Sequence, residues 1–261
     1  MRFVLVEPSH AGNIGACARA LRSMGFTRLC VVRPAVPQFR SVPEARALAA
    51  GAVDVLEQAG EFDSLGAALQ GVHLAFATTG YAREHAPAPL DVRSAARQAA
   101  RDALDPLRQL AFVFGPERTG LANADVQRCQ QCCSIPADPQ RGSLNLAQAA
   151  QVVAYETRRE FLALDGAADR PAPRRDHTQG APRAAEPPAS VEQAEAMYAH
   201  LEQGLVALGY LDPAQPRHLM ARLRHLFTRA APSAAEIDIL RGVAAAMVQP
   251  RRERAGGKTG R

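Results

Sequence analysis

Four short segments of the chain combine glycine with hydroxyl, amide or charged side chains, which are groups that bind and orient ligands. Each follows a short apolar run; the segments are Ser9–Leu21, Thr78–Gly80, Gly115–Leu121 and Gly142–Asn145. Glycine lets a backbone approach a ligand closely, and the side chains of Ser, Thr and Asn both donate and accept hydrogen bonds. Their recurrence in separate loops predicts one ligand site that draws on several parts of the chain.

Each segment also has an ordinary structural explanation. Arg19 lies in an otherwise small and apolar helical stretch, where a charge needs a partner or a cavity. It could instead face solvent together with Arg22. Ser143 or Asn145 could cap the helix that follows, and Glu117 could be a loop carboxylate or could orient a basic group in the site. Taken singly, the segments leave these alternatives open.

Residues 1–164 alternate between short apolar runs and helical patterns. The runs are typical of buried parallel strands and cover Phe3–Glu7, Leu29–Val32, Leu74–Thr78, Ala111–Phe114 and Cys133–Ile135. The helical patterns cover about 13–24, 43–50, 63–70, 92–103, 122–129 and 145–163. This alternation predicts an α/β domain with helices on both faces of a mostly parallel sheet. Ligands bind beyond the carboxyl ends of such strands, so we expect the site at the loops after Thr78, Phe114 and Ile135.

A second part of the chain follows a change in composition. Residues 165–190 are rich in Ala and Pro and predict a flexible linker. Helical spacing returns over 191–249, which we expect to form a small helical domain, and the basic tail 250–261 is expected to be disordered. Four arginines around its second helix predict contacts with an RNA backbone; they are Arg217, Arg222, Arg224 and Arg229. A solvated face of a dimerisation domain is the alternative.

Three of the segments resemble, in order, the three motifs of the SpoU branch of the trefoil-knotted SPOUT methyltransferases. The N-x-G…R, G-x-E-x-x-G-L and S-L-N motifs are matched by Asn13, Gly15 and Arg19, by Gly115, Glu117, Gly120 and Leu121, and by Ser143, Leu144 and Asn145. The likeness covers residues 1–164 and about 195–248. It is closest to the branch members that methylate the ribose of nucleotide 32 in tRNA.

The resemblance implies S-adenosylmethionine-dependent 2′-O-methylation of tRNA, with cytidine or uridine at position 32 as the target. It also implies a trefoil knot in the α/β domain and a homodimer. The cofactor would contact Thr78, Thr79, Gly80, Gly115, Ile135, Gly142, Ser143 and Leu144. The catalytic group would comprise Arg19, Ser143, Asn145, Glu117 and Asn13. Relatives often carry serine where this chain has Gly142. Glycine can still contact the cofactor there if the contact is made mainly by backbone groups.

Composition and cysteine spacing bear on the partners, the location and the metal content of the protein. The net charge of +5 is compatible with a polyanionic partner. The chain has no apolar run of eighteen residues and no signal-peptide pattern at its start, so we expect a cytoplasmic protein without a membrane segment. The cluster Cys129, Cys132 and Cys133 lacks a second ligand pair, which favours buried reduced thiols over a metal site.

Three other functions compete with tRNA methylation. A SpoU-type enzyme acting on ribosomal RNA is the first alternative, and a non-catalytic RNA-binding or cofactor-sensing relative is the second. The presence of Arg19, Ser143 and Asn145 argues against the second. A flavin or nicotinamide enzyme is disfavoured because the first glycine segment is not G-x-G-x-x-G.

Overall fold

The computed structural model describes residues 1–80, 87–138, 143–168 and 189–249. The chain divides into two compact units, Met1–Ala184 and Ala185–Arg261, referred to below as the N-terminal and C-terminal units. The expected linker over 169–188 and the expected tail over 250–261 lie outside the described residues.

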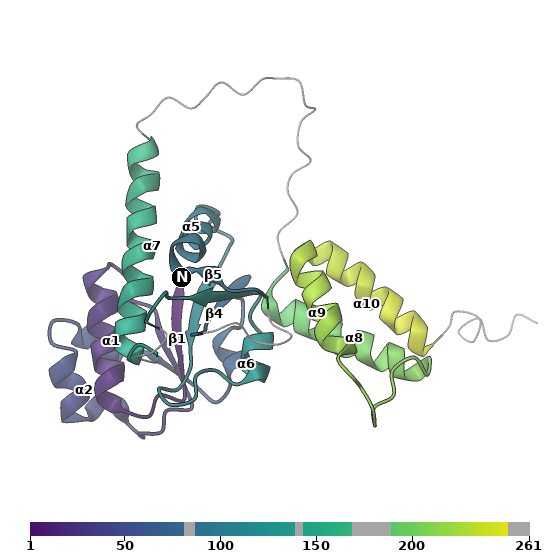
Figure 1. The fold of residues 1–261 in the computed structure, drawn as a ribbon, viewed down its shortest axis with the longest axis horizontal. Helices are drawn as coiled ribbons and strands as arrows, with labels where there is room; N and C mark the ends of the chain where they lie inside the picture. Colours follow the sequence, from purple (N-terminus) through teal and green to yellow (C-terminus); the bar gives the residue numbers. More distant parts are fainter. Residues whose placement is uncertain (81–86, 139–142, 169–188, 250–261) are drawn as a thin grey trace, which may run out of the picture. The chain divides into compact units, whose positions relative to one another are not determined.

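The N-terminal unit contains a parallel sheet of seven strands (Figure 1). In chain order the strands are β1 Arg2–Val6, β2 Leu29–Val32, β3 Gly60–Phe62, β4 Leu74–Thr78, β5 Leu90–Asp91, β6 Leu110–Phe114 and β7 Gln131–Ser134. Their order in the sheet is β3-β2-β1-β6-β4-β7-β5. The five predicted strands are therefore present. The sequence did not predict β3 and β5, because three and two residues are too few to show an apolar pattern.

The chain leaves β1 in one direction along the sheet, through β2 and β3, and then occupies the other side with β4, β6 and β7. Such a change of direction opens a crevice at the carboxyl ends of the central strands. The carboxyl ends of β6, β4 and β7 are neighbours there. These are the three strand ends at which the sequence predicts the ligand site.

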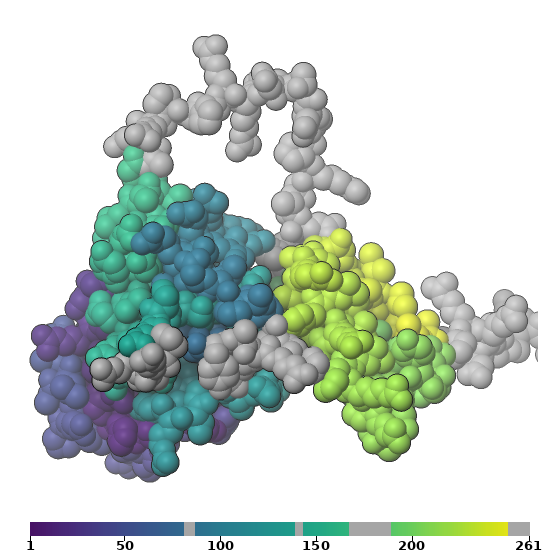
Figure 2. Space-filling view, in the orientation of Figure 1, coloured from purple at the N-terminus to yellow at the C-terminus, as the bar shows by residue number. Residues whose placement is uncertain are grey.

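Helices and loops bury the sheet on both faces. The helices of this unit are α1 Ala11–Ser23, α2 Pro43–Leu48, α3 Val53–Glu57, α4 Leu65–Ala68, α5 Val92–Asp102, α6 Asn123–Gln127 and α7 Leu146–Ala168, with a 3₁₀ turn at Phe39–Ser41. Alternate strand residues such as Phe3, Phe76 and Phe112 form one core with α1, α5 and α7. Strand β1 is visible in the ribbon (Figure 1). In the space-filling view other atoms cover it (Figure 2). The residues Phe3 to Val6 of β1 are at most 1% exposed.

The third motif, Ser143–Asn145, lies directly before helix α7. This helix begins at Leu146, one residue after the predicted start, and it continues to Ala168. The first four residues of the expected linker are therefore helical, which agrees with the high helix propensity of alanine at two of them. The trefoil knot implied by the resemblance stays a prediction, because residues 139–142, just before α7, lie outside the described part of the chain.

Three helices make up the described part of the C-terminal unit: α8 Val191–Ala207, α9 Leu219–Ala230 and α10 Ala234–Val248. Met197, Tyr198 and Ile237 form its small core between α8 and α10. A capping box of Ser233 and Glu236 is present at the start of α10. Within the described ranges of both units, no helix combines the length and apolar character needed to cross a membrane.

Candidate active site

A pocket of about 490 Å³ opens beyond the carboxyl ends of β4 and β6 and beside the segment that follows β7. Its lining includes seven of the eight residues predicted to contact the cofactor: Thr78, Thr79, Gly80, Gly115, Ile135, Ser143 and Leu144. The eighth, Gly142, lies outside the described residues. Residues from three of the four glycine-containing segments thus meet at one place, and the segment Ser9–Leu21 does not line the pocket.

Two threonine hydroxyls point to a polar ligand in this pocket. The Oγ1 atoms of Thr78 and Thr79 are buried and have no hydrogen-bond partner among the described residues. The backbone of Thr79 is already engaged, because its N–H donates to the carbonyl of Cys133 at 2.8 Å. A buried hydroxyl without a partner costs about 1–3 kcal/mol. A ligand that offers these hydroxyls hydrogen bonds would recover that free energy.

The rest of the lining is mixed. Leu121, Ile135, Leu144 and Leu146 contribute apolar side chains, and Glu117, Arg118 and Asp138 contribute charged ones. Apolar walls combined with a few polar groups are the usual form of a small-molecule site. The residues present therefore fit a ligand with a flat apolar ring system and a polar end, as S-adenosylmethionine has.

Gly115 allows the loop after β6 to fold back on itself. A Cβ atom at this position would lie 2.2 Å from the backbone nitrogen of Leu121 and 2.4 Å from the carbonyl carbon of Gly120. The loop is closed by the N–H of Gly120, which donates to the carbonyl of Pro116 at 2.9 Å. Gly120 itself has a φ of 65°, which favours glycine. Both glycines of the second motif are thus needed for the shape of the pocket wall.

The glycine of the first motif has a different task. A Cβ atom at Gly15 would lie 2.0 Å from the carbonyl oxygen of Ala45, at the contact between α1 and α2. Gly15 therefore serves close helix packing, and it does not line the pocket. The sequence alone did not separate this packing role from a ligand-binding role.

Glu117 is held by residues of the first segment. Its Oε2 accepts hydrogen bonds from the Oγ and the backbone N–H of Ser9, at 2.6 and 3.0 Å. Its Oε1 accepts one from Nδ2 of Asn13, at 2.6 Å. Burial acts to raise the pKa of Glu117, but the hydrogen bonds from Ser9 and Asn13 outweigh burial and lower its pKa below the ordinary value. The carboxylate is therefore ionised at neutral pH.

The same hydrogen-bond network reaches the third motif, Ser143–Asn145. Nδ2 of Asn145 donates to Oδ1 of Asn13 at 3.1 Å, and Oδ1 of Asn145 accepts from the N–H of Ala147 at 2.9 Å. Asn145 thus caps α7, as one of the alternatives proposed, and it also joins the two other motifs. Hydrogen bonds therefore connect Asn13, Glu117 and Asn145, one residue from each motif. Ser9 belongs to the network as well, although the sequence offered no signal for its role.

Arg19 lies apart from this network in the single chain. It is exposed on α1, and its side chain makes no hydrogen bond or ion pair with any residue in the described ranges. Six residues of helix separate it from Asn13, which is about 9 Å along the axis. The hypothesis that Glu117 orients a basic group is not supported for Arg19, because the hydrogen bonds of Glu117 go to Ser9 and Asn13.

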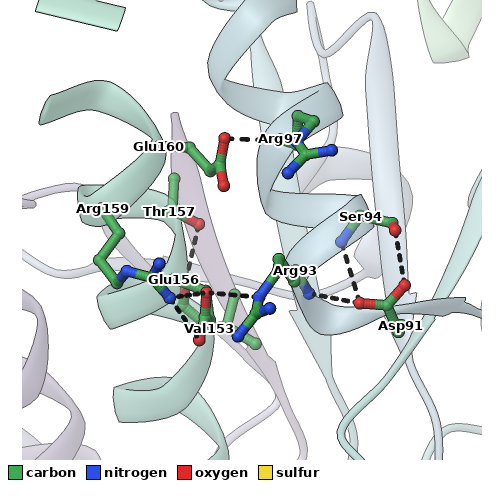
Figure 3. A network of polar contacts seen from close by, with 9 residues as sticks. All are labelled: Asp91, Arg93, Ser94, Arg97, Val153, Glu156, Thr157, Arg159 and Glu160. Carbon is green, nitrogen blue, oxygen red and sulfur yellow. Dashed lines mark hydrogen bonds and ion pairs between the residues drawn. The ribbon is translucent and has the colours of Figure 1, made fainter. Parts of the chain in front are cut away.

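A second hollow of about 710 Å³ shares Ile135, Ser143 and Leu144 with the pocket. Charged side chains of α5 and α7 border it (Figure 3). Arg93 pairs with Glu156 at 3.8 Å, and one turn further along both helices Arg97 pairs with Glu160 at 3.5 Å (Figure 3). These ion pairs hold α7, which carries Asn145 at its start, against α5.

The four arginines of the C-terminal unit are not equivalent. Arg217, Arg222 and Arg229 are exposed. Arg224 instead pairs with both carboxylate oxygens of Glu195, with one contact at 3.0 Å, and its guanidinium lies 4.3 Å from the centre of the Tyr198 ring. Its hydrogen-bonding edge is therefore occupied within the unit, so the geometry assigns Arg224 a structural role.

All five cysteines are buried thiols. Burial raises the pKa of Cys133 to about 12, so its thiol stays protonated at neutral pH. Within the described residues, no group of His, Cys, Asp and Glu side chains is arranged to hold a metal ion.

Sequence comparison agrees with this fold and site. The profile of the SpoU rRNA Methylase family matches residues 1–155, and the profile of the tRNA methyltransferase TrmJ C-terminal domain matches residues 192–258. A parallel sheet, a pocket at its carboxyl edge and three motifs joined by hydrogen bonds thus belong to a methylase of the SpoU class.

Individual relatives extend the match over nearly the whole chain. A tRNA (cytidine/uridine-2′-O-)-methyltransferase TrmJ from Cronobacter sakazakii is 41% identical over 254 residues, which are 97% of this chain and 98% of the relative. A tRNA (cytidine/uridine/adenosine-2′-O-)-methyltransferase TrmJ from Pseudomonas aeruginosa is 41% identical over 93% of this chain and 91% of its own. The crystal structure of TrmJ from Z. mobilis ZM4 superposes with a TM-score of 0.77 at 31% identity, covering 94% and 98% of the two chains. The chain belongs to the TrmJ family.

Proposed function

We propose that this protein transfers a methyl group from S-adenosylmethionine to the 2′-hydroxyl of a tRNA ribose, with cytidine or uridine at position 32 as the target. The observation that carries the proposal is the hydrogen-bonded group of Asn13, Glu117 and Asn145 beside a pocket with two unpaired threonine hydroxyls. The two TrmJ relatives support the choice of tRNA and of the ribose oxygen. Because tRNA is the proposed substrate, we infer that the protein acts in the cytoplasm.

The cofactor would occupy the pocket between the loops after β4, β6 and β7. Thr78 and Thr79 would supply hydroxyl groups to its polar end, and Leu121, Ile135 and Leu144 would contact its apolar ring. When bound, S-adenosylmethionine supplies an electrophilic methyl group that needs no further activation.

The chain's own residues would position the ribose and stabilise charge. Holding the 2′-oxygen in line with the methyl group is catalysis by orientation. The hydroxyl is a very poor acid, so its oxygen needs a partner as negative charge develops. Arginine side chains carry a positive charge in proteins, which suits Arg19 to stabilise this oxygen or to bind the neighbouring phosphate.

The exposed arginines of the C-terminal unit would contact the tRNA backbone. Replacing Arg222 and Arg229 together with glutamine is expected to weaken tRNA binding about tenfold at physiological salt and to reduce the salt dependence of binding, because two phosphate contacts are lost. Fluorescence anisotropy with labelled tRNA at several salt concentrations measures both. Arg224→Gln is the matched control, since it should lower thermal stability without reducing the salt dependence. An unchanged salt slope in the double variant would contradict the assignment.

The protein is further proposed to act as a homodimer. Tyr155 and Leu162 lie seven residues apart on one face of α7, and both are exposed in the single chain at 49% and 52%. Exposed large apolar side chains on one helix face are typical of a subunit interface. Sedimentation of the full chain should give twice the monomer mass of 27.9 kDa; a monomer at micromolar concentration would contradict the proposal.

The central experiment incubates the protein with labelled S-adenosylmethionine and unmodified bulk tRNA. Nuclease digestion and mass spectrometry then identify the methylated nucleoside and its position. The expected product is 2′-O-methylcytidine or 2′-O-methyluridine at position 32. Label on a base would overturn the reaction type, and label on ribosomal RNA alone would favour the alternative that the SpoU family profile names.

A further inference from the structure

The hydrogen bonds between Ser9, Glu117, Asn13 and Asn145 have a fixed direction. An ionised carboxylate only accepts hydrogen bonds, so Asn13 must turn its Nδ2 toward Glu117. The Oδ1 of Asn13 then faces Asn145 and can only accept, so Asn145 turns its Nδ2 toward Asn13. The Oδ1 of Asn145 accepts the N–H of Ala147, which requires the same orientation from the other end.

This direction decides what Asn145 offers to a ligand. Its Nδ2 carries two hydrogens, and Asn13 takes one, so the second N–H has no partner among the described residues. Asn145 directly follows Ser143 and Leu144, which line the pocket. An N–H donor beside the pocket would stabilise the negative charge that develops on an attacking oxygen. An amide turned by 180° would instead present an oxygen and repel that charge.

The Glu117 carboxylate accepts three hydrogen bonds from other residues, and Ser9 donates two of them. Of these two, only the bond from the hydroxyl depends on the side chain. Both Ser9 and Glu117 are partly buried, so water replaces the lost hydroxyl incompletely. Without this bond the carboxylate keeps only the bonds from the backbone N–H of Ser9 and from Asn13. It is then held less firmly, and so is the orientation of Asn13 that depends on it.

We propose that Ser9 is a positioning residue that acts through Glu117 and Asn13 to hold Asn145 with an N–H group, and not an oxygen, available to the reacting ribose. The inference rests on the proposed function for the identity of the reaction. It adds to that function a residue outside the three motifs and a reason why Glu117 must be ionised.

The test compares Ser9→Ala with Ser9→Thr in the full-length protein. Ser9→Ala should lower kcat for tRNA methylation about tenfold, the size that a hydrogen bond to a charged group is worth. The dissociation constant of S-adenosylmethionine should stay within about twofold of the wild-type value, because Ser9 does not line the pocket. Ser9→Thr keeps the hydroxyl and should restore most of the activity. Ser41→Ala removes an exposed hydroxyl far along the chain and is the matched control.

Two further measurements separate positioning from folding. A ¹³C NMR titration should show a higher pKa of Glu117 in Ser9→Ala than in the wild type, because the charged form has lost a hydrogen bond. Asn145→Asp keeps the oxygen that caps α7 but has no N–H, so it should lose at least as much kcat as Ser9→Ala while retaining the wild-type unfolding temperature.

Several outcomes would overturn the inference. They are a wild-type kcat in Ser9→Ala, a wild-type kcat in Asn145→Asp, or equal losses in Ser9→Ala and Ser9→Thr. A wild-type protein that methylates no tRNA would instead refute the proposed function. The titration of Glu117 still tests the contact of Ser9 with that carboxylate in that case, so the two failures are distinguishable.

Discussion

Gly115→Ala is expected to weaken the binding of S-adenosylmethionine by about 100-fold. The new Cβ atom would lie 2.2 Å from the nitrogen of Leu121, so the loop from Gly115 to Leu121 must open. Forcing atoms into a packed site typically costs 1–3 kcal/mol, which is about 10- to 100-fold in affinity. The upper end is expected because the clash is with backbone, which cannot rotate away as a side chain can.

Isothermal titration calorimetry of wild type and variant with S-adenosylmethionine measures this effect. Gly66→Ala is the control, because its Cβ atom would meet nothing closer than 3.6 Å. That variant should bind the cofactor as the wild type does. Wild-type affinity in Gly115→Ala would show that the loop wall is not part of the binding site.

Arg19→Ala is expected to reduce methylation about 100-fold or more while the protein stays folded and binds its cofactor. The loss reflects removal of a charged group that stabilises the developing oxyanion, for which 10²–10³ is a typical effect. Folding should be unaffected because Arg19 is exposed and bonds to no described residue through its side chain. Cofactor affinity should be unchanged, because Arg19 does not line the pocket.

Two neighbouring variants sharpen this experiment. Arg19→Lys keeps the charge but loses the planar two-pronged donor, so its activity should fall between those of alanine and wild type. Arg22→Ala, on the same helix, removes only an exposed ion pair with Asp54 at 3.4 Å and should methylate normally. Near-normal turnover in Arg19→Ala with intact cofactor binding would contradict the proposed role of Arg19 in stabilising the oxyanion.

The acid sensitivity of the site follows from Glu117. Its pKa is lower in the folded protein than in the unfolded chain, because the hydrogen bonds from Ser9 and Asn13 favour the charged form over the effect of burial. The stability that these hydrogen bonds contribute is therefore complete above the ordinary glutamate pKa. It is lost as the pH falls through the lowered value. The network of Asn13, Glu117 and Asn145 is intact across the neutral range.

Local patterns in the sequence were sufficient for much of the fold. The strands Leu29–Val32 and Leu74–Thr78 have the predicted bounds, because continuous apolar runs are the signature of strands buried on both faces. The position of the pocket also followed, since the ligand crevice of a parallel sheet lies at its carboxyl edge. Strands as short as Leu90–Asp91 could not be predicted, because two residues carry no periodicity.

What the sequence by itself determined is which residues are candidates for the chemistry. Three ordered motifs predicted Asn13, Glu117 and Asn145 as site residues without showing which of them touch, although Asn13 and Asn145 are 132 positions apart. Only the tertiary structure decided that Glu117 bonds to Ser9 and Asn13, and that Arg224 pairs with Glu195. The reason is physical: hydrogen bonds and ion pairs join residues more than a hundred positions apart, or on separate helices. Their partners are set by how the sheet and helices pack, and no local pattern records that packing.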